Sequence, residues 1–317
     1  MADAATPTIG WIGTGRMGYQ LALRLLTAGY DVAAYNRTRA KADPLAEHGA
    51  KIVDRPLDLA ARDVVCIMVS TDSDLESVIS GEGGLLTCDD DAPKIVIDSS
   101  TVSTEASERI RAIVEARGAQ FVAAPVSGNP LVIAAGKLTV AASGPRAAFD
   151  EVEPLLAVWG NGVTYVGEGE SARLVKIAHN VFLGVVIQSL TEITTLAERG
   201  GVSRAAFLEF LNDSVLGSTF TRYKSPALVN LDFHPTFTNV LLRKDLQLGL
   251  TAGRALGVPM PLAAATDMLV AQAIAAGYTA DDFATLVLEQ ARRSGYAIVP
   301  ENVPVDDGLA PEVPGEA

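Results

Sequence analysis

The feature that most constrains the fold is a glycine-rich loop between an apolar run and a helical pattern. The run Thr8–Ile12 leads directly into Gly13-Thr14-Gly15-Arg16-Met17-Gly18. In a strand–loop–helix unit, Gly13 permits a tight turn, Gly15 lets a pyrophosphate approach the backbone, and Gly18 lets the helix pack closely. The helix N-terminus offers N–H groups and a positive dipole end to the phosphates. The loop therefore predicts a dinucleotide site made of these six residues, with a purely structural turn as the alternative.

Short apolar runs alternate with helical patterns up to about residue 166. Several runs are apolar without alternation, as expected of strands buried on both faces of a parallel sheet. The predicted strands are Thr8–Ile12, Asp31–Tyr35, Val64–Val69, Ile95–Ile97, Phe121–Ala124, Leu138–Ala142 and Thr164–Val166. Strand–helix alternation predicts an α/β Rossmann domain, doubly wound and mostly parallel, over residues 1–167.

The rest of the chain has only helical patterns. Ser171–Arg199 is expected to form one long interdomain helix that ends at Gly200-Gly201. Further helices are predicted at Arg204–Leu211, Asn239–Ala255, Pro261–Ala276 and Asp281–Arg293. An all-α domain for substrate binding and dimerisation follows, over residues 168–298. Residues 299–317 are acidic and rich in Pro, and are expected to be a disordered tail.

Composition narrows the class of protein. A formal net charge of −13 argues against nucleic-acid binding, which needs a basic surface. The two cysteines, Cys66 and Cys88, exclude a disulfide framework and fit a reducing compartment. No secretory signal is recognised at the N-terminus, so a cytoplasmic location is expected. Polar residues within the apolar segment Leu174–Leu190 favour a buried helix over a membrane span, and no metal site is expected.

The end of the second predicted strand indicates the cofactor. Enzymes that use NAD usually carry an acid about 20 residues after the loop, where it binds the ribose 2′-hydroxyl. Asn36 stands there instead and does not repel a 2′-phosphate, while Arg37 can pair with it and Thr38 can donate a hydrogen bond. Arg39 and Lys41 add positive charge. The pattern predicts NADP, with NAD possible; an ordinary surface role for Arg37 is the alternative.

A lysine on the long predicted helix is the candidate catalytic residue. Lys176 and Asn180 are four residues apart and therefore share one face. Apolar neighbours remove solvation from Lys176, which favours its neutral form and suits acid/base chemistry. The spacing alone leaves open a lysine that merely extends from a core helix to solvent.

Four motifs together resemble the β-hydroxyacid dehydrogenase family, which includes 3-hydroxyisobutyrate dehydrogenase, tartronate semialdehyde reductase and the 6-phosphogluconate dehydrogenases. The resemblance extends to about residue 295. The motifs are residues 10–18, residues 124–128 with 136–138, residues 167–180, and Lys244-Asp245-Leu246-Gln247-Leu248. Each motif is modest alone, but their order and spacing make the combination specific.

The resemblance implies a role for each site residue. Lys176 would exchange a proton with the substrate oxygen while hydride passes to or from the nicotinamide, and Asn180 would orient the substrate. Phe237 would cover the site, or would simply pack in the core. The implied substrate-binding residues are Ser127, Gly128, Asn129 and Lys244, and the remaining cofactor candidates are Val69, Ser70, Thr101 and Lys244.

Two departures from the family pattern concern the substrate. Ala124 stands where the family usually has Asp, and Asn129 stands where it usually has a second glycine. Pro130 favours an extended conformation at Asn129, which keeps its N–H but adds a polar side chain. Asn129 is therefore either a determinant of substrate choice or a residue that only shapes the turn.

The expected function is NAD(P)-dependent interconversion of a small 3-hydroxy acid and its semialdehyde or 3-oxo acid, in a homodimer or larger homo-oligomer. Two alternatives remain: an imine reductase-like enzyme, and a non-catalytic NADP-binding scaffold. Lys176 together with Ser127 and Gly128 favours the first reading, because imine reductases commonly replace the lysine and inactive relatives tend to lose it.

Overall fold

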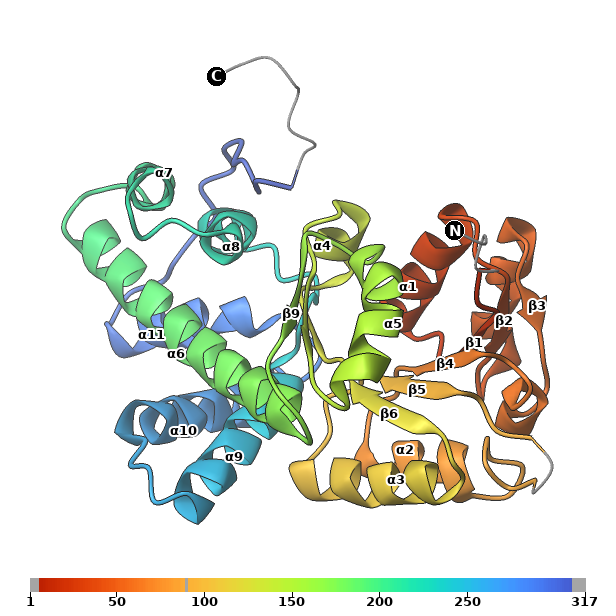
Figure 1. The fold of residues 1–317 in the computed structure, drawn as a ribbon. Coiled ribbons are helices and arrows are strands. Elements are labelled where there is room, and N and C mark those ends of the chain that lie inside the picture. The colour runs from red at the N-terminus through yellow and green to blue at the C-terminus, as the bar shows by residue number, and fades with distance from the viewer. Residues whose placement is uncertain (1–5, 89–90, 310–317) are drawn as a thin grey trace. The chain divides into compact units, whose positions relative to one another are not determined.

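The computed structural model describes residues 6–88 and 91–309, which form two compact units (Figure 1). Among the described residues, unit 1 extends to Lys176 and unit 2 begins at Ile177. The division falls inside one continuous helix, α6 (Ser171–Arg199), whereas the sequence places the boundary at residue 167. The chain therefore passes between the units along an unbroken helix.

A six-stranded sheet, parallel throughout, forms the centre of unit 1, in the order β3-β2-β1-β4-β5-β6. Its strands are β1 (Ile9–Ile12), β2 (Val32–Tyr35), β3 (Lys51–Ile52), β4 (Val64–Ile67), β5 (Ile95–Asp98) and β6 (Gln120–Ala123). The strand order reverses between β1 and β4. In open α/β sheets a ligand binds at such a switch point, beyond the carboxyl ends of the strands.

Two hydrophobic clusters cover the two faces of this sheet. One contains Trp11 of β1 with Leu21 and Leu25 of α1, and the other contains Ile12 of β1 with Leu75 of α2. Neighbouring side chains of a strand thus enter opposite clusters, and both are buried. This double burial explains why the strands are apolar without alternation. The helices of unit 1 are α1 (Arg16–Thr27), α2 (Asp72–Ser80), α3 (Thr104–Ala116), α4 (Pro130–Ala134) and α5 (Arg146–Ala157), with short 3-10 turns at Arg39–Lys41, Asp43–His48 and Pro56–Leu59.

The last strands of unit 1 do not join the main sheet. β7 (Val126–Ser127), β8 (Thr139–Ala142) and β9 (Gly162–Tyr165) form a separate three-stranded sheet, in which β7 and β8 are antiparallel. The predicted strands Leu138–Ala142 and Thr164–Val166 thus fall at β8 and β9 of this second sheet, which the sequence pattern did not distinguish from the main one. The burial of β8 and β9 varies along each strand, unlike the fully buried β1 and β4, because these strands are covered less completely.

Within the described part of unit 2 every regular element is a helix, which confirms the predicted all-α domain. The helices after α6 are α7 (Arg204–Asp213), α8 (Thr219–Asn230), α9 (Asn239–Ala255), α10 (Pro261–Ala275), the 3-10 turn Phe283–Thr285 and α11 (Leu286–Arg293). The sequence does not predict α8, because Pro226 interrupts a weakly apolar stretch. A capping box between Ser218 and Thr221 nevertheless fixes its first turn.

By length and composition alone, α6 would suit a membrane span. Its inward side nevertheless carries buried polar residues, Gln188 and Thr191 among them. Val181 and Ile187 of the same helix belong to the hydrophobic cluster of unit 2. We therefore interpret α6 as a core helix.

A buried ion pair joins three segments of unit 2. Lys224 of α8 and Asp282 are 2% and 1% exposed, and Lys224 Nζ lies 2.7 and 2.8 Å from the two carboxylate oxygens. Asp282 also accepts hydrogen bonds from the backbone N–H groups of Thr236 (3.0 Å) and Ala284 (2.9 Å). Burial raises the pKa of Asp282, but the Lys224 ammonium and these hydrogen bonds outweigh it and hold the pKa below its ordinary value.

The segment 299–309 has no helix or strand but is held to unit 2. The Glu301 carboxylate accepts hydrogen bonds from the backbone N–H groups of Arg204 (2.6 Å) and Ala205 (3.1 Å), in the first turn of α7. The fully buried Arg204 guanidinium donates to the carbonyl oxygens of Val229 and Val299. The expected disorder is therefore wrong for residues 299–309, because these contacts fix the backbone. Residues 310–317 lie outside the described residues.

Candidate functional site

The three loop glycines stand in different surroundings. Gly13 has a φ of +95°, and a Cβ there would lie 2.1 Å from the carbonyl oxygen of Met68. A Cβ on Gly18 would lie 2.0 Å from the carbonyl oxygen of Gly13, so the protein itself requires glycine at both positions. A Cβ on Gly15 would meet no atom within 4 Å. The space beside Gly15 is open, as a ligand that approaches the backbone needs.

The start of α1 also leaves polar groups available. Gly15 is the N-cap residue and provides no side-chain cap for the first turn, which begins with Arg16 and Met17. Thr14 is 3% exposed, and its Oγ1 is buried with no hydrogen-bond partner in the part of the chain described here. A buried hydroxyl without a partner is unfavourable, so this loop fits a bound group with hydrogen-bonding oxygens.

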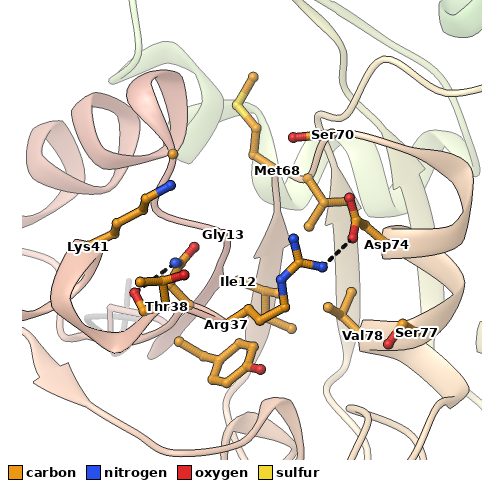
Figure 2. A pocket seen from close by; sticks show the side chains of 14 residues that line it. Ile12, Gly13, Arg37, Thr38, Lys41, Met68, Ser70, Asp74, Ser77 and Val78 are labelled. Atoms are coloured by element: carbon orange, nitrogen blue, oxygen red, sulfur yellow. Dashed lines mark hydrogen bonds and ion pairs between the residues drawn. The ribbon is translucent and has the colours of Figure 1, made fainter.

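A pocket lies at the carboxyl ends of β1, β2 and β4, beside α2 (Figure 2). It is the place that the switch point of the sheet indicates. The structure brings together at this pocket most residues that the sequence predicts for the cofactor. The lining residues are Ile12, Gly13, Gly15, Tyr35, Asn36, Arg37, Thr38, Lys41, Met68, Val69, Ser70, Asp74, Ser77 and Val78.

Asn36 and Arg37 have partners in the protein. The Asn36 amide accepts a hydrogen bond from the Thr14 backbone N–H and donates to the carbonyl oxygen of Thr38, both at 2.9 Å, so it ties the glycine loop to the end of β2. Arg37 Nη1 lies 2.7 Å from Asp74 Oδ1 (Figure 2). Arg39 instead pairs with Asp43 and Asp54 and does not line the pocket. Lys41 does line it.

Sequence reasoning missed Asp74. It lies in the first turn of α2, which follows β4, and its backbone N–H donates to the capping Thr71 Oγ1 at 3.1 Å. The sequence carried a signal, since Thr71 starts a capped helix directly after a buried strand. The position of Asp74 opposite Arg37 depends on how β2 and β4 flank β1, which is a property of the sheet order.

A buried polar network supports the wall of the site in unit 1. The Val69 backbone N–H donates to Ser100 Oγ at 2.9 Å, and Ser100 Oγ donates to Asp98 Oδ1 at 2.6 Å. Arg173, which is 1% exposed, pairs with the Asp98 carboxylate and donates to the carbonyl oxygen of Ser100 at 2.5 Å. The network fixes the start of α6, three residues before Lys176, against the segment that leads to Thr101. No local sequence pattern indicates this network, because its members lie far apart in the chain.

The predicted substrate loop begins at Ser127 and turns through Gly128, which has a φ of +147°. Asn129 is 5% exposed and caps α4, because its Oδ1 accepts hydrogen bonds from the N–H groups of Leu131 (2.9 Å) and Val132 (3.0 Å). The structure thus shows that Asn129 shapes the turn. Its Nδ2 is buried with no hydrogen-bond partner among residues 6–88 and 91–309, so the N–H groups of this amide have no acceptor there.

In unit 2 the candidate residues surround a buried carboxylate. Asn180 is 4% exposed, and its Nδ2 donates to Asp245 Oδ2 at 2.5 Å. Lys244 Nζ lies 3.3 Å from Asp245 Oδ1, and His179 Nδ1 lies 3.0 Å from Asn180 Oδ1. Asp245 therefore holds the amide of Asn180 in one place. Sequence reasoning quoted Asp245 within its motif but gave it no role, and it missed His179.

Two further candidates are Lys176, the last residue of unit 1, and Phe237 of unit 2. Lys176 is half-buried, one helical turn before Asn180 on α6. Phe237 packs edge-on against Phe283, with ring centroids 5.9 Å apart, at the hydrophobic cluster of unit 2. The structure thus shows Phe237 in core packing, the second of the two roles considered for it.

Comparison with known families and proteins gives consistent matches along the chain. Residues 8–167 match the NAD binding domain of 6-phosphogluconate dehydrogenase. Residues 170–289 match the NAD-binding family of NADP-dependent 3-hydroxyisobutyrate dehydrogenase. Among curated proteins, glyoxylate/succinic semialdehyde reductase 1 of Arabidopsis thaliana is 30% identical over 282 residues, which cover 88% of this chain and 96% of the relative.

A solved structure and a second relative extend the comparison. A structure of Mycobacterium tuberculosis 3-hydroxyisobutyrate dehydrogenase with L-serine is similar, with a TM-score of 0.77 and 25% identity, over 89% of this chain and 98% of the other. The human cytokine-like nuclear factor N-PAC is 29% identical over 89% of this chain. The chain spans about half the length of that relative, 51%.

Proposed function

Because the chain belongs to the β-hydroxyacid dehydrogenase family, we propose that it interconverts a small 3-hydroxy acid and the corresponding semialdehyde or 3-oxo acid. The family binds a nicotinamide cofactor, and several of its relatives are named as reductases or dehydrogenases. The observation that carries the proposal is the position of Lys176 on α6, one helical turn before Asn180, whose amide Asp245 fixes.

Lys176 is the proposed general acid and base. The nicotinamide, when bound, supplies or accepts the hydride. Lys176 Nζ donates a proton to the substrate oxygen in reduction and takes the alcohol proton in oxidation. Asn180 orients that oxygen, since a buried amide held by a carboxylate loses little further freedom on binding. Lys244 neighbours the same carboxylate and is the proposed contact to cofactor and substrate.

The cofactor fits the residues present in unit 1. The open space beside Gly15 and the unpartnered Thr14 Oγ1 suit the pyrophosphate, and Thr101 is the proposed neighbour of the nicotinamide ribose. Two cations, Arg37 and Lys41, line the pocket at the end of β2, where no acid follows the strand. These features support NADP as the preferred cofactor, with NAD as a second substrate.

The proposed substrate carries an acidic group. Ser127 supplies a hydroxyl, Gly128 a backbone N–H, and Asn129 an unpartnered Nδ2 as donors. Such donors suit an anion, because charge-assisted hydrogen bonds are about twice as strong as neutral ones. The name of the Arabidopsis relative, a glyoxylate/succinic semialdehyde reductase, refers to small carboxylic acids of this kind.

The test is turnover of a panel of 3-hydroxy acids and semialdehydes with NADP(H) and NAD(H), each acid beside its neutral amide. We expect turnover of at least one acid and weak or no turnover of its amide. Equal turnover of acid and amide would remove the acid-binding part of the proposal. Tight NADPH binding without turnover of any member would favour the second candidate, a non-catalytic scaffold, which the similarity to N-PAC raises.

The proposed functional unit is a homodimer or larger. Phe182 and Leu196 of α6 lie fourteen residues apart, about four turns, and are 69% and 73% exposed. Phe210 of α7 is 73% exposed. Large exposed apolar side chains in one unit are typical of an interface. Light scattering should give at least twice the monomer mass, and a monomer at working concentration would contradict the proposal.

A further inference from the structure

We propose that Asp74 sets the cofactor preference of this site: it competes with a 2′-phosphate for Arg37 and so limits the preference for NADP over NAD. This inference rests on the proposed function only in taking the pocket as the adenosine end of a nicotinamide cofactor site. In this proposal the carboxylate that disfavours a 2′-phosphate comes from α2, because the end of β2 carries Asn36 and no acid.

The ion pair is part of the pocket wall. Arg37 follows β2 and Asp74 lies in the first turn of α2, and both line the pocket. Figure 2 shows the Arg37 side chain crossing to Asp74, with Nη1 2.7 Å from Oδ1. The Arg37 side chain is 83% exposed and that of Asp74 is 23% exposed. The arginine that is proposed to bind the phosphate therefore already has a carboxylate partner.

The two partners are held to different degrees. The backbone of Asp74 is fixed by the Thr71 cap, and a carboxylate in the first turn of a helix is stabilised by the helix dipole. Arg37 is a long, exposed side chain that forms an ion pair with Asp74. Arg37 can therefore turn to a ligand, whereas the backbone of Asp74 is held at the pocket wall.

This ion pair should weaken the binding of NADP but not the binding of NAD. A 2′-phosphate must take Arg37 from Asp74 and then lie near a carboxylate that has lost its partner. A phosphate monoester carries about −1.5 to −2 charges, so the repulsion falls on it and not on the 2′-hydroxyl of NAD. Among the described residues that line the pocket, the charged ones are Arg37, Lys41 and Asp74. Neutralising Asp74 leaves two cations facing the phosphate.

The test is Asp74→Asn, which removes the charge and keeps the shape. Calorimetry would compare 2′,5′-ADP with 5′-AMP, and fluorescence titration would compare NADPH with NADH. We expect 2′,5′-ADP and NADPH to bind about three- to fivefold tighter, the upper range that exposed charge pairs support, and the other two ligands to change by less than about twofold. The gain should shrink at high salt, because exposed charges are screened.

Two controls accompany this variant. Asp150→Asn removes a carboxylate from the exposed Arg146–Asp150 pair, which does not line the pocket, and should leave all four affinities unchanged. In an Arg37→Ala background, Asp74→Asn should increase the affinity for NADPH and 2′,5′-ADP by less, because there is no Arg37 guanidinium for the substitution to release.

The outcomes separate this inference from the proposed function. Weaker NADPH binding in Asp74→Asn would show that Asp74 positions Arg37 for the phosphate, and would overturn the proposal. An equal change for NADPH and NADH would overturn it as well. Wild-type protein that binds neither cofactor would instead overturn the cofactor assignment, and the inference with it.

Discussion

Ion pairs are held in two different ways in the two units. In unit 1, Arg37 and Asp74 meet at the wall of a pocket, and the arginine side chain is 83% exposed. In unit 2, Lys224 and Asp282 are 2% and 1% exposed and are surrounded by further hydrogen bonds. An exposed pair contributes about 0–1 kcal/mol, whereas breaking a buried pair destabilises by about 3–5 kcal/mol. The arginine of the exposed pair can leave its carboxylate and bind a ligand, whereas the buried pair stabilises the fold.

The largest expected effect comes from Lys176, which belongs to neither pair. Lys176→Ala should lower kcat by about 10²–10⁴-fold, the usual contribution of general acid/base catalysis. Cofactor affinity should stay close to wild type, because Lys176 does not line the pocket at the end of β2. Steady-state kinetics and NADPH titration on the same preparation check both parts. A variant that keeps more than about a tenth of the wild-type rate would refute the role.

The next effect tests the buried side of the comparison. Lys224→Ala should destabilise the protein by about 3–5 kcal/mol, because it leaves the Asp282 carboxylate buried without its cation. Lys94→Ala is the matched control, since Lys94 pairs with Glu151 at an exposed position and its loss should change stability by less than about 1 kcal/mol. Urea denaturation measures both. Similar values for the two variants would break the distinction between buried and exposed pairs.

The Lys224–Asp282 pair should also make the stability of the protein depend on pH. The pKa of Asp282 is lower in the folded protein than in the unfolded chain, so the unfolded state binds the proton more readily. Its contribution to stability is present above the unfolded pKa of about 3.9 and is lost as the pH falls through the lower folded value. Denaturation curves below about pH 4 should therefore show falling stability.

The exposed pair should affect cofactor binding and leave the fold intact. Arg37→Ala should raise the Michaelis constant for NADP about tenfold or more, as loss of hydrogen bonds to a charged group implies, with little change for NAD. Its melting temperature should match the wild type, because the side chain is mostly exposed. Equal effects on the two cofactors would show that Arg37 does not contact the 2′-phosphate.

The smallest expected effect concerns Asn129, which caps α4 and is also proposed to bind the substrate. Asn129→Asp keeps an oxygen to cap α4 but replaces the unpartnered Nδ2 donor with an acceptor. We expect a two- to tenfold increase in the Michaelis constant for the acid substrate, about one hydrogen bond, with unchanged stability. Asn129→Gly removes the cap and the donor and should shift the ranking of acids in the panel. An unchanged ranking with normal rates in both variants would leave Asn129 purely structural.

The elements that sequence predicts well are those with a strong local pattern. The bounds of α6 and α9 agree with their predictions at both ends, because apolar periodicity, Gly200-Gly201 and the Thr238 cap mark them. β3 and β7 have two residues each and carry no periodicity. The sequence does not distinguish the three-stranded sheet from the main sheet. The residue pattern of a strand indicates which side chains are buried, but not which strand lies beside it.

The candidate site shows the same limit. The glycine loop and the residues at the end of β2 are contiguous in sequence, so their chemistry could be predicted. Asp74 meets Arg37 only through the strand order, and Arg173 meets Asp98 across 75 positions of sequence. Neither partner could be identified from local pattern. Asn129 shows the opposite case, where the sequence raised both readings and the structure supplied the capping bonds.

The two indole rings of unit 1 give the protein an internal optical reporter. The sequence contains two tryptophans. Trp11 donates from its ring nitrogen to the carbonyl oxygen of Gly13 at 2.9 Å, and it meets Trp159 edge-on with ring centroids 5.8 Å apart. Unit 2 has no tryptophan, so tryptophan emission follows the loop-bearing unit alone, while circular dichroism follows mainly the helices. Indole emission overlaps the absorption of reduced nicotinamide. Quenching of the tryptophan fluorescence by energy transfer can therefore measure binding of the reduced cofactor without any label.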